Sequence, residues 1–90
     1  MSTQPLTADD VIDVRFHPTK FRWGYDQRQV DDFLDRVIDA LRPVAERQLP
    51  TVLTRQEVQD VTFRATRWRE GYDQDEVDAL LERVRESLPI

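Results

Sequence analysis

Residues 21–37 read FRWGYDQRQVDDFLDRV, and residues 68–84 read WREGYDQDEVDALLERV, which is the same pattern 47 positions later. The likeness extends over residues 6–41 and 53–88, which align without a gap and are identical at 18 of 36 positions. Self-similarity at a fixed period indicates a duplicated structural unit. The sequence therefore predicts two repeats, at 6–41 and 53–88, joined by a linker at 42–52 that contains two prolines.

Each repeat predicts a short helix followed by a long one. Thr7 and Thr54 stand three residues before an acidic residue, which is the spacing of a capping box at the start of a helix. Asp26 and Asp73 hold the same kind of N-cap position before the second helix, along which apolar residues recur with a 3.6-residue period. Because no strand pattern is evident, we expect an all-α fold of two tandem helix–loop–helix repeats, packed as a small pseudo-twofold helical bundle. The linker is long enough for the two long helices to run either parallel or antiparallel.

The only two glycines of the chain, Gly24 and Gly71, stand at the ends of the two loops. At such a position glycine supplies either a positive φ or room for a chain that passes close by. We interpret both glycines as structural.

The composition excludes several classes of protein. The 13 basic and 18 acidic residues give a net charge of −5, unlike dedicated nucleic-acid-binding domains. The chain has no cysteine and a single histidine, His17, so we expect a non-enzymatic protein without a metal, a cofactor or a small-molecule substrate. No apolar run approaches the roughly 20 residues of a membrane-spanning helix, and no signal peptide is evident, so we expect a cytoplasmic protein. One run of carboxylates is interpreted as a solvated helix face rather than a metal site: Asp31, Asp32, Asp35 and Asp39.

Basic charge gathers in the loop of each repeat. Residues 15–23 contain three cations and three aromatic residues, and residues 63–69 contain three cations and two aromatic residues, with no acid in either segment. Such a loop suits an anionic membrane surface, because its cations meet the headgroups while a ring enters the interface. An alternative is purely structural, with the loop arginines paired to the acidic helices and Phe16 and Phe63 in the core. The candidate membrane-binding or partner-binding residues are Lys20, Phe21, Arg22, Trp23, Arg67, Trp68 and Arg69.

The order of these motifs resembles the N-terminal domain of the DivIVA family, and most of all the tandem-repeat DivIVA-domain proteins of actinobacteria. The resemblance rests on Leu6-Thr7, Phe16, Gly24-Tyr25-Asp26 and residues 30–37, and again on Leu53-Thr54, Phe63, Gly71-Tyr72-Asp73 and residues 77–84. It implies a cytoplasmic scaffold of cell division, the cell cycle and cell shape, whose heads form a parallel dimer with crossing loops. It also implies lipid contact by an aromatic residue followed by arginine, at Phe21-Arg22 and Trp68-Arg69 here.

Two main hypotheses for function follow, and nucleic-acid binding through the loops, which would require a steep dependence on salt, is a third. In the first, a DivIVA-like protein of cell division and polar growth uses its two basic aromatic loops to bind an anionic membrane or a scaffold protein, peripherally on the inner face of the cell membrane. In the second, the chain is an adaptor that pairs with a full-length DivIVA-type protein without touching lipid. Both leave room for a homodimer, because a chain this short has a thin core.

Overall fold

The computed structural model describes residues 5–48 and 52–89. Within these residues the two long helices are α2 (Gln27–Leu41) and α4 (Gln74–Ser87), and the two short ones are α1 (Ala8–Ile12) and α3 (Arg55–Asp60). A short 3₁₀ helix, η1 (Val44–Glu46), follows α2. The strands are β1 (Pro18–Thr19), β2 (Gly24–Asp26), β3 (Ala65–Thr66) and β4 (Gly71–Tyr72).

The helix starts lie where the capping residues predicted them. The Thr7 side chain accepts a hydrogen bond from the Asp10 N–H at 3.1 Å, and the Asp10 carboxylate accepts one from the Thr7 N–H at 3.0 Å. This is a complete capping box. Asp26 and Asp73 each cap a long helix by accepting a hydrogen bond from the backbone N–H three residues ahead, at 3.0 Å. Their side chains therefore fix where each loop ends and each long helix begins.

The expectation of an all-α helical bundle is wrong, because the chain also forms a four-stranded antiparallel sheet in the order β1-β4-β2-β3. The fold is a mixed α/β structure. Each strand has only two or three residues, which is too short to show the alternation that marks a strand in a sequence. Moreover, every strand pairs with a strand of the other repeat. The paired residues are therefore far apart in the sequence, and no local hairpin pattern reveals the pairing.

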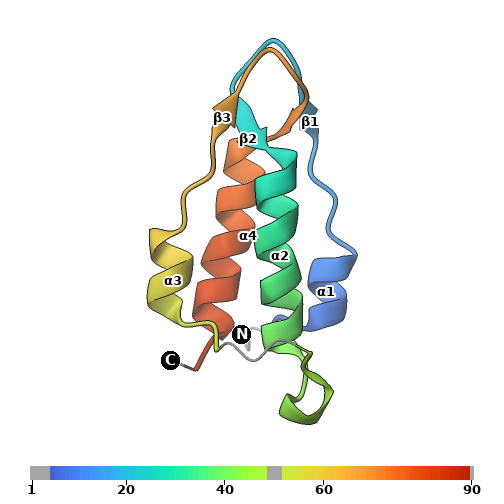
Figure 1. Cartoon of the computed structure of the whole chain (residues 1–90), viewed down its shortest axis with the longest axis vertical. Coiled ribbons are helices and arrows are strands. Elements are labelled where there is room, and N and C mark those ends of the chain that lie inside the picture. Colours follow the sequence, from blue (N-terminus) through green and yellow to red (C-terminus); the bar gives the residue numbers. More distant parts are fainter. Residues whose placement is uncertain (1–4, 49–51, 90) are drawn as a thin grey trace, which may run out of the picture.

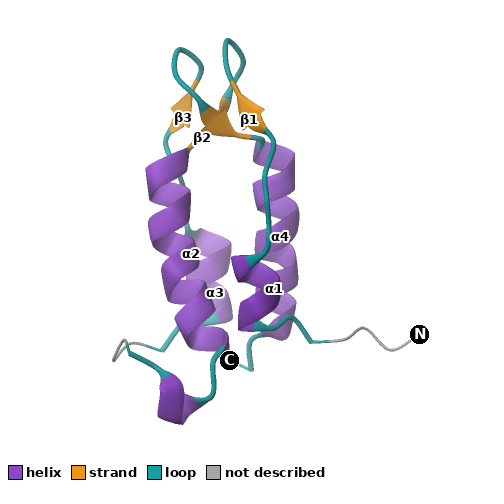
Figure 2. Cartoon of the chain, turned by 90° about the vertical axis from the view of Figure 1, so that its right-hand side faces the viewer, coloured by secondary structure: helices purple, strands orange, loops and turns teal. Residues whose placement is uncertain are grey.

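The sheet interleaves the two repeats. β1 and β2 belong to the first repeat, β3 and β4 to the second, and strands of the two origins alternate across the sheet. At the centre, where β2 meets β4, Tyr25 pairs with its counterpart Tyr72. The two loops therefore cross above the sheet in Figure 1, and they rise from it as two separate tips in Figure 2.

The two long helices run parallel. α2 follows β2 directly and α4 follows β4 after one residue, and these two strands are neighbours in the sheet. Both helices therefore start at the sheet and extend away from it in the same direction (Figure 1). Of the two arrangements that the linker permits, the chain adopts the parallel one.

Gly24 and Gly71 make room for the crossing strands. Neither residue has a positive φ, so left-handed backbone is not the reason for glycine here. A Cβ on Gly24 would lie 2.8 Å from the carbonyl oxygen of Tyr72, and a Cβ on Gly71 would lie 2.8 Å from that of Tyr25. Between them sits Thr19, which is only 1% exposed. Of the two roles that the sequence left open, close passage of another chain segment is the one that applies.

The core lies between the helices below the sheet. Its centre is a seam of four fully buried valines, Val30 and Val37 on α2 and Val77 and Val84 on α4. The short helices cover the outside, where α1 packs on α2 and α3 packs on α4. Toward the sheet, the core is closed by two ring pairs that join the repeats, with centroid distances of 5.1 and 5.4 Å: Phe16–Tyr72 and Tyr25–Phe63.

Candidate functional site

The two loop tips lie side by side at the end of the molecule that is farthest from the short helices (Figures 1 and 2). One backbone hydrogen bond joins them, from the Phe21 N–H to the Arg67 carbonyl oxygen at 2.8 Å. Phe21 also has a φ of 64°, in the left-handed region that costs a bulky residue about 1–2 kcal/mol. The crossing of the loops thus holds Phe21 in a backbone conformation that it would not adopt alone.

Three large aromatic side chains are exposed at this end. Phe21 is 68% exposed, Trp23 is 55% exposed and Trp68 is 74% exposed. Exposed apolar side chains gathered in one place mark an interaction surface more often than scattered ones do. We call these three residues, together with Lys20 and Arg67, the basic aromatic tip.

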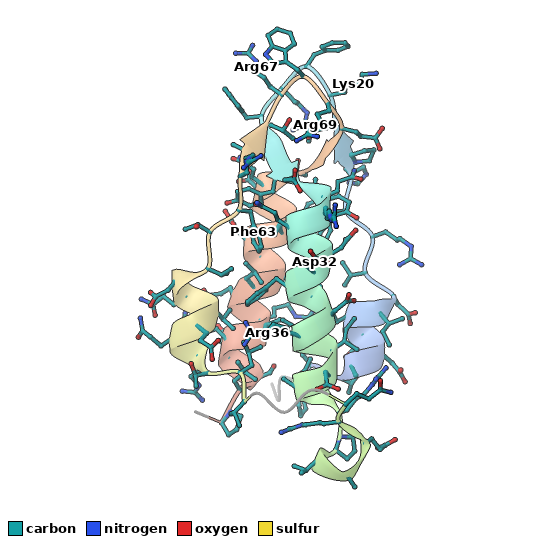
Figure 3. The ribbon with its side chains drawn as sticks, in the orientation of Figure 1. Lys20, Asp32, Arg36, Phe63, Arg67 and Arg69 are labelled. Atoms are coloured by element: carbon teal, nitrogen blue, oxygen red, sulfur yellow. The ribbon has the colours of Figure 1, made fainter. Side chains whose placement is uncertain are left out.

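Cations and rings are in direct contact within the tip. The Arg67 guanidinium carbon lies 5.3 Å from the centre of the Trp23 ring and 5.1 Å from that of Trp68. The Lys20 ammonium lies 5.5 Å from the Phe21 ring. These are cation–π distances. Arg67, from the second repeat, thereby links Trp23 of the first repeat to Trp68 of the second. Figure 3 shows Lys20 and Arg67 at the extreme end of the molecule.

Arg22 and Arg69, two further candidate residues, face back toward the helices. The Arg22 guanidinium lies 3.4 Å from the Asp73 carboxylate, and that of Arg69 lies 3.6 Å from the Asp26 carboxylate. Each loop arginine therefore pairs with the N-cap of the long helix in the other repeat. The Glu76 N–H, and after it Arg22, hold the pKa of Asp73 below its usual range. Both arginines remain largely exposed beside the tip, but part of their charge is neutralised by these pairs.

A second layer of contacts beneath the tip ties each loop to the other repeat. The Tyr25 hydroxyl donates to Asp78 and the Tyr72 hydroxyl donates to Asp31, each at 2.8 Å. Burial, the hydrogen bond and the carboxylate charge together raise the pKa of each tyrosine to about 12. Sequence reasoning missed these pairs, although the same spacing from tyrosine to aspartate in both repeats was a visible signal.

The sole histidine belongs to the same layer. The backbone N–H of His17 donates to the Glu76 carboxylate at 2.7 Å, and its ring Nδ1 lies 2.6 Å from the other oxygen of that carboxylate. In the second repeat the N–H of Arg64 donates to Gln29 at 2.6 Å, so the backbone contact is kept although both side chains differ. His17 therefore ties the first loop to the start of α4.

The acidic residues of α2 do not form one solvated face. Asp31 accepts the bond from Tyr72, and Asp39 is only 5% exposed and accepts a hydrogen bond from the Gln48 N–H at 2.8 Å. The interpretation of all four carboxylates as a solvated face is thus wrong for Asp39, because the chain after α2 folds back over it. Across residues 5–48 and 52–89, no group of three potential ligands could hold a metal ion.

No helix in the described part of the chain is long and apolar enough to cross a bilayer. No family model matches the chain, and no curated protein or solved structure matches it. The geometry of the basic aromatic tip is therefore the main guide to function.

Proposed function

We propose that the protein binds anionic membrane surfaces through the basic aromatic tip, as a non-enzymatic DivIVA-like protein of cell division and polar growth on the inner face of the cell membrane. The observation that carries the proposal is the exposure of Phe21, Trp23 and Trp68 at one end, in contact with Lys20 and Arg67. Supporting it, the loops cross in the manner that the resemblance to DivIVA heads implies.

The magnitudes fit a reversible peripheral contact. A lysine or arginine near an anionic bilayer contributes about 1 kcal/mol, so Lys20 and Arg67 supply roughly 2 kcal/mol. A buried apolar ring adds about 1.5–3 kcal/mol, and the three rings of the tip can enter the interface together. Because part of the attraction is electrostatic, binding should weaken as salt is added.

The acidic helices do not oppose this contact strongly. The net charge of −5 comes from carboxylates that are concentrated on the helices, whereas the tip itself has none. The molecule is 42 Å long, and the screening length at physiological salt is about 8 Å. Most of the helical carboxylates are therefore screened from a membrane that touches the tip.

The interleaved sheet argues against the second hypothesis, in which the chain pairs with the head of a full-length DivIVA-type protein. Each repeat already fills the place that such a head would take, through the pairs β1–β4 and β2–β3. Exchange would require that these pairs, and the tyrosine–aspartate bonds beside them, break first. Lipid contact needs no such opening.

Co-sedimentation with vesicles tests the proposal. Wild-type protein should pellet at low salt with vesicles that contain both phosphatidylglycerol and phosphatidylcholine. It should not pellet at high salt, and it should not pellet with vesicles of phosphatidylcholine alone. The double variant Phe21→Ser/Trp68→Ser should lose binding while it stays helical. Val44→Ser is the matched control, because Val44 is an equally exposed apolar residue on η1 at the other end of the molecule. Failure of the wild type to pellet with anionic vesicles at low salt would contradict the proposal.

A further inference from the structure

The duplication supplies an internal comparison between two grooves. The first groove lies between α1 and α2 and has a volume of about 540 Å³. The second lies between α3 and α4, with a volume of about 360 Å³, and is lined by the equivalent positions of the second repeat. The shared positions of the two grooves can therefore be compared one by one.

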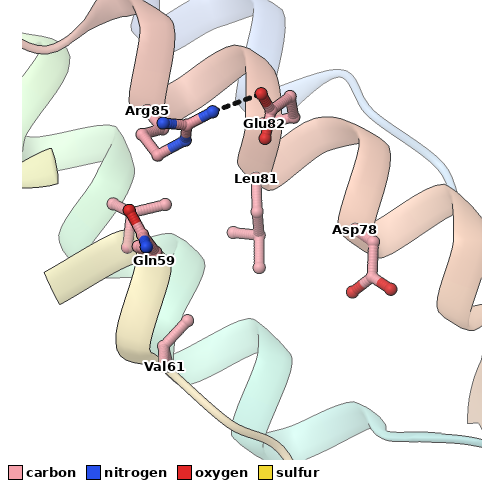
Figure 4. A pocket seen from close by; sticks show the side chains of 7 residues that line it. Gln59, Val61, Asp78, Leu81, Glu82 and Arg85 are labelled. Carbon is pink, nitrogen blue, oxygen red and sulfur yellow. Dashed lines mark hydrogen bonds and ion pairs between the residues drawn. The ribbon is translucent and has the colours of Figure 1, made fainter. Parts of the chain in front are cut away.

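In the second groove the Glu82 carboxylate has a cationic partner. Arg85 pairs with Glu82 along α4, as the dashed line in Figure 4 shows, and Gln59 of α3 also lines this groove. Glu82 thus has a cation from its own helix, and the polar groups reduce the apolar surface of this groove.

In the first groove isoleucines replace the polar residues. Ile12 stands where the second repeat has Gln59, and Ile38 stands where it has Arg85. Ile12 is 44% exposed. Asp35, the counterpart of Glu82, consequently has no arginine three residues ahead of it on its own helix. Within the described part of the chain, its carboxylate makes no hydrogen bond or ion pair. An exposed apolar surface next to an unpaired carboxylate distinguishes this groove.

The other polar groups of the first groove are already engaged. The Arg15 guanidinium donates to the carbonyl oxygens of Ile12 and Val14 at 3.1 and 2.9 Å, so it closes the end of α1 rather than pairing with Asp35. Asp31 accepts the hydrogen bond from Tyr72. Asp35 is therefore the group in this groove with capacity for a further partner.

We infer that the first groove binds a segment of another protein in which a large aliphatic side chain stands next to a lysine or arginine. The aliphatic side chain packs on Ile12 and Ile38, and the cation takes the place beside Asp35 that the Arg85 guanidinium holds beside Glu82 in the second groove. Charge favours this occupant over a second copy of the chain. Two first grooves placed face to face would bring the Asp31 and Asp35 carboxylates of the two copies together.

The location of the groove separates this inference from membrane binding. α1 lies toward the ends of the long helices that are remote from the sheet and the tip (Figure 1). A segment bound there would not occupy the basic aromatic tip. The groove can therefore hold a partner whether or not the tip contacts lipid, and the two ideas can fail independently.

A chemical-shift titration of ¹⁵N-labelled protein tests the inference. The probe is a synthetic 14-residue amphipathic helix of leucine and lysine, and the same helix with glutamate for lysine is its control. Shifts should gather on residues 11–14 and 34–38 and spare residues 58–61 and 81–85. The glutamate peptide should not bind.

Two variants convert one groove into the other. Ile12→Gln/Ile38→Arg gives the first groove the residues of the second and should weaken peptide binding at least about tenfold, since it removes buried aliphatic contact and neutralises Asp35. Gln59→Ile/Arg85→Ile should create a second site and raise the stoichiometry to two. Each variant carries residues already accommodated at the equivalent position, and retained helicity checks its fold.

Several results would overturn the inference. These are no binding at millimolar peptide, equal binding by Ile12→Gln/Ile38→Arg, or shifts spread evenly over both grooves. Self-association of the wild type that the same variant abolishes would show that a second copy fills the groove, which also contradicts the proposed occupant.

Discussion

Gly24 lies so close to Tyr72 that a Cβ added to the glycine would stand 2.8 Å from the tyrosine carbonyl oxygen. The two residues belong to different repeats, and they meet where one loop passes the other. The same distance recurs between Gly71 and the carbonyl oxygen of Tyr25. The two crossing points thus depend on glycine for space, and substitutions there test the interleaved sheet directly.

Gly24→Ala should destabilise the protein by about 2–3 kcal/mol, because the added methyl group overpacks a site bounded by backbone. Urea denaturation followed by circular dichroism measures the change. The new Cβ would also meet the Thr19 hydroxyl oxygen at 1.9 Å. A second variant, Gly24→Ala/Thr19→Ala, removes that contact and keeps the one with the carbonyl oxygen. Full recovery of stability in the double variant would show that the side chain, and not the crossing strand, demands glycine.

The tyrosine–aspartate pairs should make the protein less stable in alkali. The folded state raises the pKa of Tyr25 and Tyr72 to about 12 from the ordinary value of 10.0. A raised pKa stabilises the fold at pH values below 10, and this contribution disappears as the pH rises through 12. Thermal unfolding from pH 9 to pH 12 should therefore show a falling midpoint. Tyr25→Phe/Tyr72→Phe should flatten that dependence, and an unchanged slope in this variant would contradict the assignment.

Arg67 should contribute more to vesicle binding than an arginine elsewhere, because it lies between two exposed tryptophan rings. Arg67→Ala removes one tip cation, worth about 1 kcal/mol at an anionic surface, so affinity should fall about fivefold. Arg67→Lys keeps the charge and should recover most of this loss. Arg42→Ala, beyond the far end of α2, is the matched control and should bind as the wild type does. Equal effects of Arg67→Ala and Arg42→Ala would show that net charge alone governs binding.

The helices and their starting residues followed from the sequence because they depend on residues close together in the chain. Thr7 and Asp26 each cap a helix through a bond to the residue three positions ahead, and that spacing is visible in one dimension. The sheet was missed for the opposite reason. Pro18 pairs with Tyr72 and Gly24 with Thr66, across the two repeats, in strands too short to carry a pattern.

The candidate site shows the same division. The loop sequences pointed to Phe21 and Trp68, which the structure leaves exposed. The sequence offered pairing of the loop arginines with the acidic helices as an alternative. It did not indicate that Arg22 would pair with Asp73 of the other repeat or that Arg67 would contact Trp23, because both contacts exist only where one loop crosses the other. Residue types therefore indicated which side chains are exposed. Which arginine contacts the tip rings and which pair with aspartates became known only from the fold.

Tryptophan fluorescence in the presence of vesicles tests the central claim most directly. The chain has two tryptophans, Trp23 and Trp68, and both stand in the basic aromatic tip. With vesicles containing phosphatidylglycerol at low salt, we expect the emission maximum to move to shorter wavelength, lipids brominated on the acyl chain to quench it, and high salt to reverse both effects. Vesicles of phosphatidylcholine alone should change nothing. An emission maximum that stays unchanged with anionic vesicles at low salt would contradict the account, because the tip would then remain in water.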